Sequence, residues 1–145
     1  MSGTSIPDLL RDAVHERDGY MCAYYKTAAK VVADDMTIDH VVPESLGGPT
    51  KLDNLCMACW RCNLIKGQRI VGTDPESGEV VRFFHPVQER WAEHFAWKDG
   101  GITMEGLTPT RRATVDGLKL NRIALKESCE LWIGAGWHPP DEDSE

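Results

Sequence analysis

Residues 36–67 have the sequence MTIDHVVPESLGGPTKLDNLCMACWRCNLIKG, and this stretch decides the expected fold. Its first part, MTIDHVVP, is rich in β-branched residues and ends in a proline, which is typical of a strand. The glycines and proline of ESLGGPTKLD predict a loop, after which NLCMAC is expected to form a short strand and WRCNLIKG a helix ending at Gly67. This order places Asp39 and His40 on, or at the end of, the first strand.

The flanking segments predict further helices and strands, and hence an α+β fold. Apolar residues recur at helical spacing between Pro7 and Arg17, which predicts an opening helix. Downstream, EVVRFF is expected to be a strand, and HFAW and ITMEGL a hairpin around the turn KDGG. Two helices should follow, the first capped by Thr108 and the second by Asn121.

Composition is that of an ordinary globular protein, with 41% hydrophobic and 27% charged residues in a chain of 145. This length favours a single domain. The start of the chain does not resemble a signal peptide, and no apolar run approaches the roughly 18 residues of a membrane span. We therefore expect a cytoplasmic protein without a membrane segment.

The charge distribution bears on nucleic-acid binding. A net charge of −7 argues against a protein that coats nucleic acid. The segment 51–69 is nevertheless locally basic and coincides with the candidate chemistry, although a solvated helix face explains such a strip equally well. Its basic side chains are Lys51, Arg61, Lys66 and Arg69.

The order of the polar motifs resembles the HNH endonuclease family. The resemblance rests on IDHVVPESLGG, LDNL and CWRCNLIKG, with RDGYMC upstream, and covers residues 11–70. The segments FFHPVQERWAEHFAW and GLTPTRRATV are also similar to the C-terminal extension of one bacterial branch of that family. The resemblance implies a ββα-metal core in about residues 11–70, with an N-terminal helix. An extension with a hairpin and two helices would occupy 71–137, before a disordered acidic tail at 138–145.

The resemblance also implies a role for each site residue. His40 would be the general base, since an imidazole, with an ordinary pKa of about 6.5, can accept a proton from water at neutral pH. Asn54 would fix the hairpin and the orientation of the base. Asp39 and Asn63 would be the protein ligands of one catalytic cation, Mg²⁺ or Mn²⁺, which suits oxygen ligands and acts as a Lewis acid at the phosphate.

The substrate implied by the resemblance is DNA, in double-stranded form, and the products would carry a 5′-phosphate and a 3′-hydroxyl. Lys66 and Arg61 are expected to meet the DNA backbone, with Lys51 and Arg69 as further contacts. We expect a monomer or a weak homodimer.

The cysteines predict a second metal site, whose ligand set is left open. Five cysteines, three of them at three-residue intervals, favour metal ligation, with zinc as the first candidate, over a disulfide framework. The family resemblance implies a structural Zn²⁺ held by two CxxC pairs, of which Cys59 and Cys62 form the second. The first pair is broken because Tyr25 follows Cys22 where the pattern has a cysteine, and a neutral tyrosine is a poor zinc ligand.

Three explanations of the broken pair remain open. Cys56 completes the ligand set, a water or a three-ligand site suffices at a cost in affinity, or the metal is absent and Tyr25 packs over reduced cysteines. A lost or weakened zinc site is slightly favoured.

Two other functions compete with the leading hypothesis of a DNA endonuclease. One is a catalytically inactive HNH-like module that binds nucleic acid, and the other is a small zinc-knuckle interaction domain. The intact His40, Asn54 and Asn63 argue against the inactive module, whereas the altered cysteine pattern and the acidic net charge keep it open.

Overall fold

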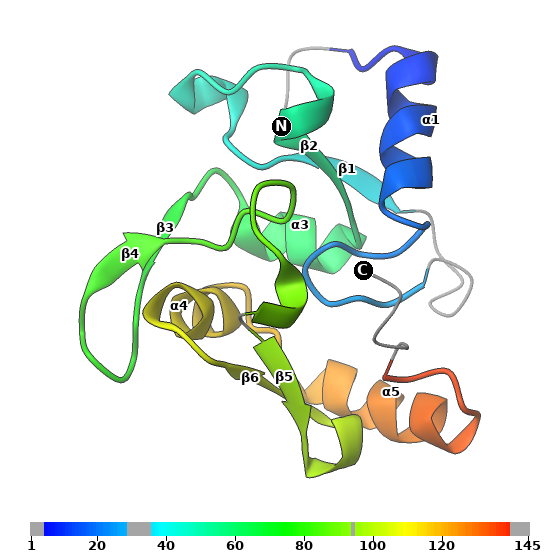
Figure 1. Ribbon diagram of the computed structural model, residues 1–145, viewed down its shortest axis with the longest axis vertical. Coiled ribbons are helices and arrows are strands. Elements are labelled where there is room, and N and C mark those ends of the chain that lie inside the picture. Colours follow the sequence, from blue (N-terminus) through cyan, green and yellow to red (C-terminus); the bar gives the residue numbers. More distant parts are fainter. Residues whose placement is uncertain (1–4, 29–35, 94, 140–145) are drawn as a thin grey trace. The chain divides into compact units, whose positions relative to one another are not determined.

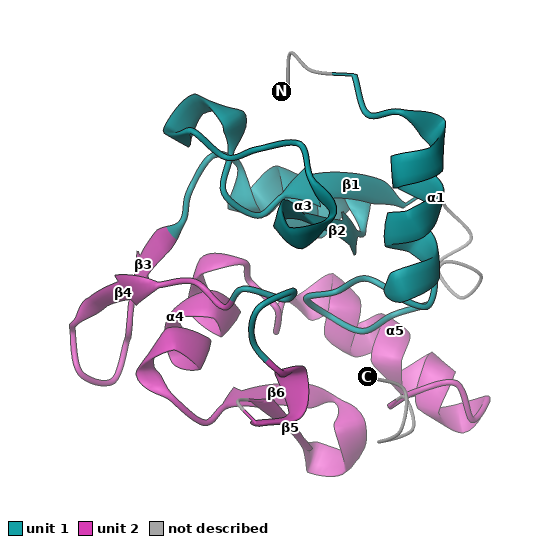
Figure 2. Cartoon of the chain, turned by 45° about the horizontal axis from the view of Figure 1, so that its top comes forward, with its two compact units in different colours: residues 1–70, 85–89 teal, residues 71–84, 90–145 magenta. Residues whose placement is uncertain are grey.

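The computed structural model describes residues 5–28, 36–93 and 95–139 (Figure 1). The chain divides into two compact units. Unit 1 contains residues 1–70 and 85–89, and unit 2 contains residues 71–84 and 90–145 (Figure 2). Both units combine helices with antiparallel strand pairs, so the predicted α+β class is confirmed. That all 145 residues form one domain stays a prediction.

Unit 1 contains the strand, loop, strand and helix that the sequence predicts for residues 36–67. β1 and β2 are antiparallel, with Ile38 opposite Met57 and Asp39 opposite Cys56. The elements of unit 1 are α1 (Asp8–Arg17), β1 (Thr37–His40), the 3₁₀ turns η1 (Glu44–Leu46) and η2 (Leu52–Asn54), β2 (Leu55–Ala58) and α3 (Trp60–Lys66).

The core of unit 1 lies between α1 and one face of the strand pair. Val14 of α1 packs with Leu55 and Met57, which alternate along β2 and so share a face. The end of α1 is also tied to β2, because the Asp18 carboxylate accepts a hydrogen bond of 2.7 Å from the Met57 amide. Asp39, a candidate site residue, and Cys56 lie on the opposite face of the pair.

Unit 2 contains the predicted hairpin and two helices, together with one strand that the sequence analysis did not anticipate. That strand is β3, which pairs with the predicted strand β4. The elements of unit 2 are β3 (Val71–Thr73), β4 (Val80–Arg82), η3 (Trp91–Glu93), β5 (Phe95–Lys98), η4 (Asp99–Gly101), β6 (Thr103–Gly106), α4 (Pro109–Gly117) and α5 (Ile123–Gly134).

The two helix caps predicted in unit 2 have different outcomes. Thr108 caps α4 as expected, because its side chain accepts a hydrogen bond from the Arg111 amide. The prediction for Asn121 is wrong, since the N-cap of α5 is Arg122. The Asn121 side chain instead bonds to both backbone groups of Met104, accepting from N–H at 2.8 Å and donating to the carbonyl at 2.9 Å.

The C-terminal end of the described chain is packed into unit 2. His138 is buried, with Nε2 3.0 Å from the Gly101 carbonyl oxygen and its ring 4.3 Å from that of Trp97. Burial lowers the pKa of His138 below the ordinary value of an imidazole. The rest of the tail predicted to be disordered, residues 140–145, lies outside the described residues. Within the described segments, no helix is both long and apolar enough to cross a bilayer.

Candidate active site and cysteine cluster

The connection between β1 and β2 is held closed by one buried asparagine. Asn54 accepts a hydrogen bond from the Val42 amide and donates to the carbonyl oxygens of Val42 and Pro49, each at 2.9 Å. Gly48, within this connection, can approach Val42 closely because it has no side chain: a Cβ there would lie 1.7 Å from the Val42 carbonyl oxygen. This geometry agrees with the expectation that Asn54 fixes the hairpin.

His40 lies at the end of β1, where the same connection contacts its ring. The residue is 7% exposed. Its Nε2 lies 3.0 Å from the Thr50 hydroxyl and 3.6 Å from a carboxylate oxygen of Glu44. Thr50 and Glu44 both belong to the connection that Asn54 closes, so the orientation of the imidazole depends on that closure.

Asp39 is a buried carboxylate with two protein partners. Its Oδ2 accepts a hydrogen bond of 2.7 Å from the Tyr24 hydroxyl and lies 3.1 Å from Nζ of Lys66, which is also 3.3 Å from Oδ1. Burial raises the pKa of Asp39, and the charge of Lys66 and the Tyr24 hydrogen bond oppose that rise without cancelling it. Burial and the neighbouring carboxylate raise the pKa of Tyr24, so its hydroxyl stays protonated and donates.

The four basic residues predicted to contact DNA are in different environments. Lys66 is 1% exposed and paired with Asp39, which does not fit the expected contact with a DNA backbone. Arg69 is exposed, but its guanidinium donates to the carbonyl oxygens of Ile65 and Lys66 and closes the end of α3. Lys51 and Arg61 are exposed.

The orientation of Asn63 follows from a chain of two hydrogen bonds. The Thr37 hydroxyl donates its single proton to the Ala58 carbonyl oxygen at 2.9 Å, so it can only accept from Asn63. The group of Asn63 that lies 2.9 Å from this hydroxyl must therefore be the amide nitrogen. The carbonyl oxygen of Asn63, which is the atom that can bind a cation, is left for another partner.

A cavity of about 910 Å³ brings together three of the four candidate residues, without Asn54. It is lined by Asp39 and His40 of β1 and by Asn63 of α3, with Arg11, Trp60 and Leu64 nearby on its wall. A carboxylate and an amide oxygen are ligands that Mg²⁺ and Mn²⁺ accept, and such ions keep several waters that an open cavity can hold. The donor set therefore fits one divalent cation, which would share the Asp39 carboxylate with the ammonium group of Lys66.

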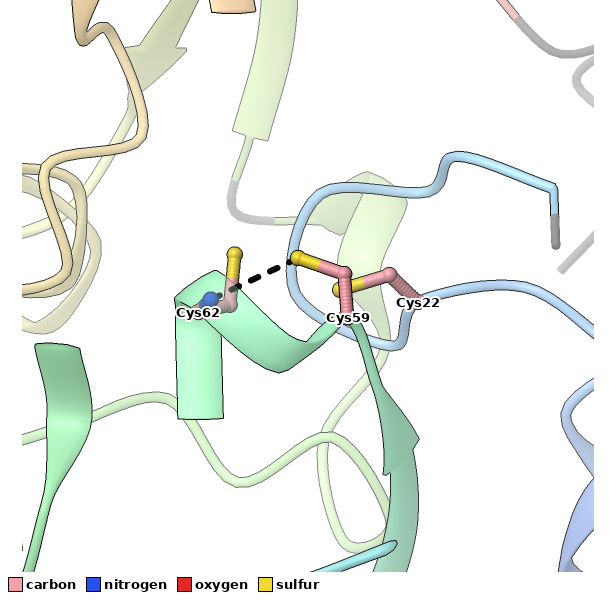
Figure 3. Close-up of side chains that lie close together, drawn as sticks. All are labelled: Cys22, Cys59 and Cys62. Carbon is pink, nitrogen blue, oxygen red and sulfur yellow. Dashed lines mark hydrogen bonds between the residues drawn. The ribbon is translucent and has the colours of Figure 1, made fainter. Parts of the chain in front are cut away.

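Three of the five cysteines form a separate cluster in unit 1. The sulfur atoms of Cys22, Cys59 and Cys62 lie within 4.8 Å of one another (Figure 3). Cys59 is the N-cap of α3, and its sulfur accepts a hydrogen bond of 3.4 Å from the Cys62 amide. Burial raises the pKa of Cys22 to about 12, and its hydrogen bond with Cys59 adds to the rise. This cluster can hold a metal ion through three sulfur ligands.

The structure limits the explanations for the missing fourth cysteine ligand. Among the described residues, the cluster does not include Cys56, which lies on β2 near Tyr24 and Asp39. Tyr25 is 1% exposed, and its backbone amide donates to the Cys22 sulfur at 3.4 Å. A three-sulfur site and a metal-free cluster covered by Tyr25 therefore both remain, whereas completion by Cys56 is not supported.

Sequence reasoning missed the residues that support the site. Thr37 lies two positions before Asp39 and so shares its face of β1. The two-residue period of a strand could therefore have predicted that Thr37 lies near the site. Tyr24 and Thr50 lie in irregular segments, where no periodicity shows which way a side chain points. These residues were found only from the folded chain.

Comparison with known proteins gives a match to a family model over one segment of the chain. Residues 22–69 match the model described as HNH endonuclease. No curated protein and no solved structure matches the chain in the same comparisons. The matched segment contains all four predicted site residues and the cysteine cluster. It ends before residue 71, so the similarity of the later segments to a bacterial C-terminal extension stays a prediction.

Proposed function

Taking residues 22–69 as a domain of the HNH endonuclease family, we propose that the chain is a metal-dependent nuclease that hydrolyses phosphodiester bonds in DNA. The observation that carries the proposal is that Asp39, His40 and Asn63 line one cavity. Family membership supports a role in nucleic-acid chemistry. The cavity adds an imidazole for proton transfer next to oxygen ligands for a cation.

In this proposal His40 removes the proton from the attacking water. Positioned general bases of this kind contribute roughly 100- to 10,000-fold to a rate. Thr50 and Glu44 hold the ring, and Asn54 holds the connection that carries both. A cation bound by Asp39 and Asn63 would supply Lewis-acid chemistry at the phosphate.

Lys66 and Tyr24 keep Asp39 suited to bind a cation. A carboxyl group buried without partners takes up a proton, and a protonated carboxyl is a poor metal ligand. The ammonium of Lys66 and the hydroxyl of Tyr24 both favour the ionised form. We therefore assign both residues a positioning role rather than a contact with DNA.

A plasmid-relaxation assay tests the proposal. The parent protein is expected to nick supercoiled DNA with Mg²⁺ or Mn²⁺, and His40→Ala should slow the reaction at least about 100-fold because the general base is lost. His15→Ala, a histidine of α1 in the same unit, is the matched control and should cleave like the parent. Equal rates for His40→Ala and the parent would refute this mechanism.

The second candidate is an inactive module that binds nucleic acid. It is favoured by one observation, the ammonium of Lys66 within 3.3 Å of both Asp39 oxygens, where it competes with a cation for the carboxylate. Titration with Mn²⁺ followed by electron paramagnetic resonance separates the two candidates. A nuclease should bind the ion and lose affinity on Asp39→Asn, whereas the inactive module should bind none at this site.

We also propose that the cysteine cluster binds Zn²⁺ more weakly than a site with four cysteines. Structural zinc usually takes four protein ligands, and this cluster supplies three. Metal analysis of protein purified without chelator should find up to one zinc per chain, and Cys59→Ser should remove it. Metal-free parent protein with the same stability as the zinc-loaded form would exclude a structural role for the ion.

A further inference from the structure

One face of α3 forms part of the cavity wall. Successive residues of a helix are turned by about 100°, so positions 60, 63, 64 and 67 lie on one side and positions 62 and 66 on another. All four positions of the first set line the cavity, whereas Cys62 and Lys66 are buried. Asn63, the proposed cation ligand, therefore shares its face with Trp60 and Leu64.

Two large apolar side chains on this face are exposed to solvent. Trp60 and Leu64 are each 55% exposed. Neither adds to the chemistry of a phosphodiester, which requires charge and hydrogen bonds. Their position on the wall of a cavity that also contains Asp39 and His40 indicates contact with an apolar part of the substrate.

The charge of the cavity wall points the same way. Arg11 is the one Lys or Arg among the described lining residues, against the carboxylates of Asp39 and Glu44. Arg61 is turned by about 100° from Trp60 along α3. Phosphate contacts alone therefore give this wall little affinity for nucleic acid, whereas stacking of a base on an aromatic ring does not depend on opposite charge.

We infer that Trp60, flanked by Leu64, is a stacking surface for a nucleic-acid base, and that the preferred substrate is single-stranded or locally unpaired DNA. In an intact duplex both faces of each base are covered by neighbouring bases, so a base must leave the stack before it can lie on an indole ring. The inference rests on the proposed function, because the surface belongs to the same cavity.

The test compares binding to three labelled oligonucleotides of one sequence: a single strand, a full duplex, and a duplex with three unpaired central nucleotides. Fluorescence anisotropy is measured on proteins that carry His40→Ala, so that cleavage does not interfere. Trp60→Ala should weaken binding to the single strand and the unpaired duplex roughly tenfold, while Trp60→Phe should change it less than about threefold. Trp137, which is 61% exposed in unit 2, supplies the matched control Trp137→Ala, expected to bind like the parent.

Each outcome decides for or against the inference. It is overturned if Trp60→Ala weakens all three oligonucleotides equally, if it weakens none, or if Trp137→Ala has the same effect. If binding depends on Trp60 but the parent protein, which has His40, cleaves no DNA, the stacking surface is retained and the proposed nuclease activity is refuted. Rapid cleavage of full duplex, unchanged by Trp60→Ala, would retain the nuclease and refute the stacking surface.

Discussion

Lys66 and Asp39 form an ion pair from which water is almost excluded, since their side chains are 1% and 5% exposed. Removing both from water is costly, and their attraction offsets that cost only while both are present. The pair is thus a weak source of stability in itself. Loss of one partner is expensive because a charge is left in the interior.

Lys66→Met should accordingly destabilise the protein by about 3 kcal/mol, because it leaves the buried Asp39 carboxylate without its cation. Urea denaturation at pH 7 measures this loss. Lys51→Met, at an exposed lysine of the same unit, is the control and should change stability by less than about 0.5 kcal/mol. Adding Asp39→Asn to Lys66→Met should recover part of the loss, and a double variant that is no more stable than Lys66→Met would contradict the account.

Tyr25 offers a second test at the level of one residue. Tyr25→Cys places a fourth thiol three residues after Cys22 and so restores the CxxC pair that the HNH resemblance implies. A complete site supplies about 10–16 kcal/mol, or several kcal/mol per ligand, so zinc affinity should rise on the order of 100-fold. Competition with a chelating dye measures this affinity.

Tyr25→Phe is the control for that experiment, because it keeps the ring and provides no ligand. It should bind zinc like the parent. If Tyr25→Cys binds zinc no more tightly than Tyr25→Phe, the fourth coordination position is not at residue 25.

At the scale of elements, each unit contains an asparagine whose side chain bonds to both backbone groups of one residue distant in sequence. Asn54 bonds to both backbone groups of Val42 in unit 1, and Asn121 bonds to both backbone groups of Met104 in unit 2. In each case one amide side chain satisfies a donor and an acceptor that would otherwise need a neighbouring strand. The chain therefore contains its own control for the role of Asn54.

Asn54→Ala and Asn121→Ala should each cost about 2–3 kcal/mol, because backbone groups lose their partners. Only Asn54→Ala should also slow DNA cleavage, since only Asn54 holds the connection that carries Thr50 and Glu44 to His40. Denaturation and plasmid relaxation, at a temperature where both variants are folded, measure the two effects. Equal cleavage by the two variants would mean that Asn54 acts through stability alone.

Most helices and strands could be predicted from sequence, whereas β3 and the cap of α5 could not. α1, α4, α5 and the β5–β6 hairpin follow from helical spacing, caps and turn residues. β3 has three residues, of which Val71 and Thr73 are exposed, so neither length nor a buried face marks it as a strand. Asn121 precedes α5 and has the chemistry of a cap, but its amide can satisfy two backbone groups on β6, which a cap cannot.

The order of the motifs predicted Asp39, His40, Asn54 and Asn63 as candidate site residues, and three of them, Asp39, His40 and Asn63, line one cavity. Their electrostatic surroundings were not predicted. The burial of Lys66 was not expected, because lysine is usually exposed and its pairing with Asp39 joins a helix to a strand 27 residues away. Contacts between residues so distant in sequence depend on how the elements pack.

At the scale of the whole molecule, the stability of unit 2 should depend on pH through one carboxylate, Asp74. Asp74, in the turn between β3 and β4, accepts two hydrogen bonds of 2.9 Å from the guanidinium of Arg112 on α4 and one of 2.6 Å from the Ser77 hydroxyl. Arg112 is the main cause of the lowered pKa of Asp74. A carboxyl group whose pKa is lower in the folded than in the unfolded chain stabilises the fold above its unfolded pKa of about 3.9.

Asp74→Asn should therefore reduce stability at pH 7, and its deficit should shrink as the pH falls below about 4, where Asp74 begins to be protonated in the unfolded parent chain while it stays ionised in the folded one. Denaturant midpoints of parent and variant between pH 7 and pH 2.5 measure the difference. Asp116→Asn on α4 is the control, with little effect at any pH. A deficit that stays constant down to pH 2.5 would show that the carboxylate charge is not the source of the stability.

α3 has only seven residues, and each of its sides makes a different set of contacts. Cys59 and Cys62 join the sulfur cluster, Lys66 reaches Asp39, and Trp60, Asn63 and Leu64 face the cavity. Inserting or deleting one residue would rotate everything beyond it by about 100° and present the wrong side chain to each of these surroundings. The fold of this segment can accordingly accept exchanges of side chains at its exposed positions, whatever they do to binding, but it cannot accept a change in length.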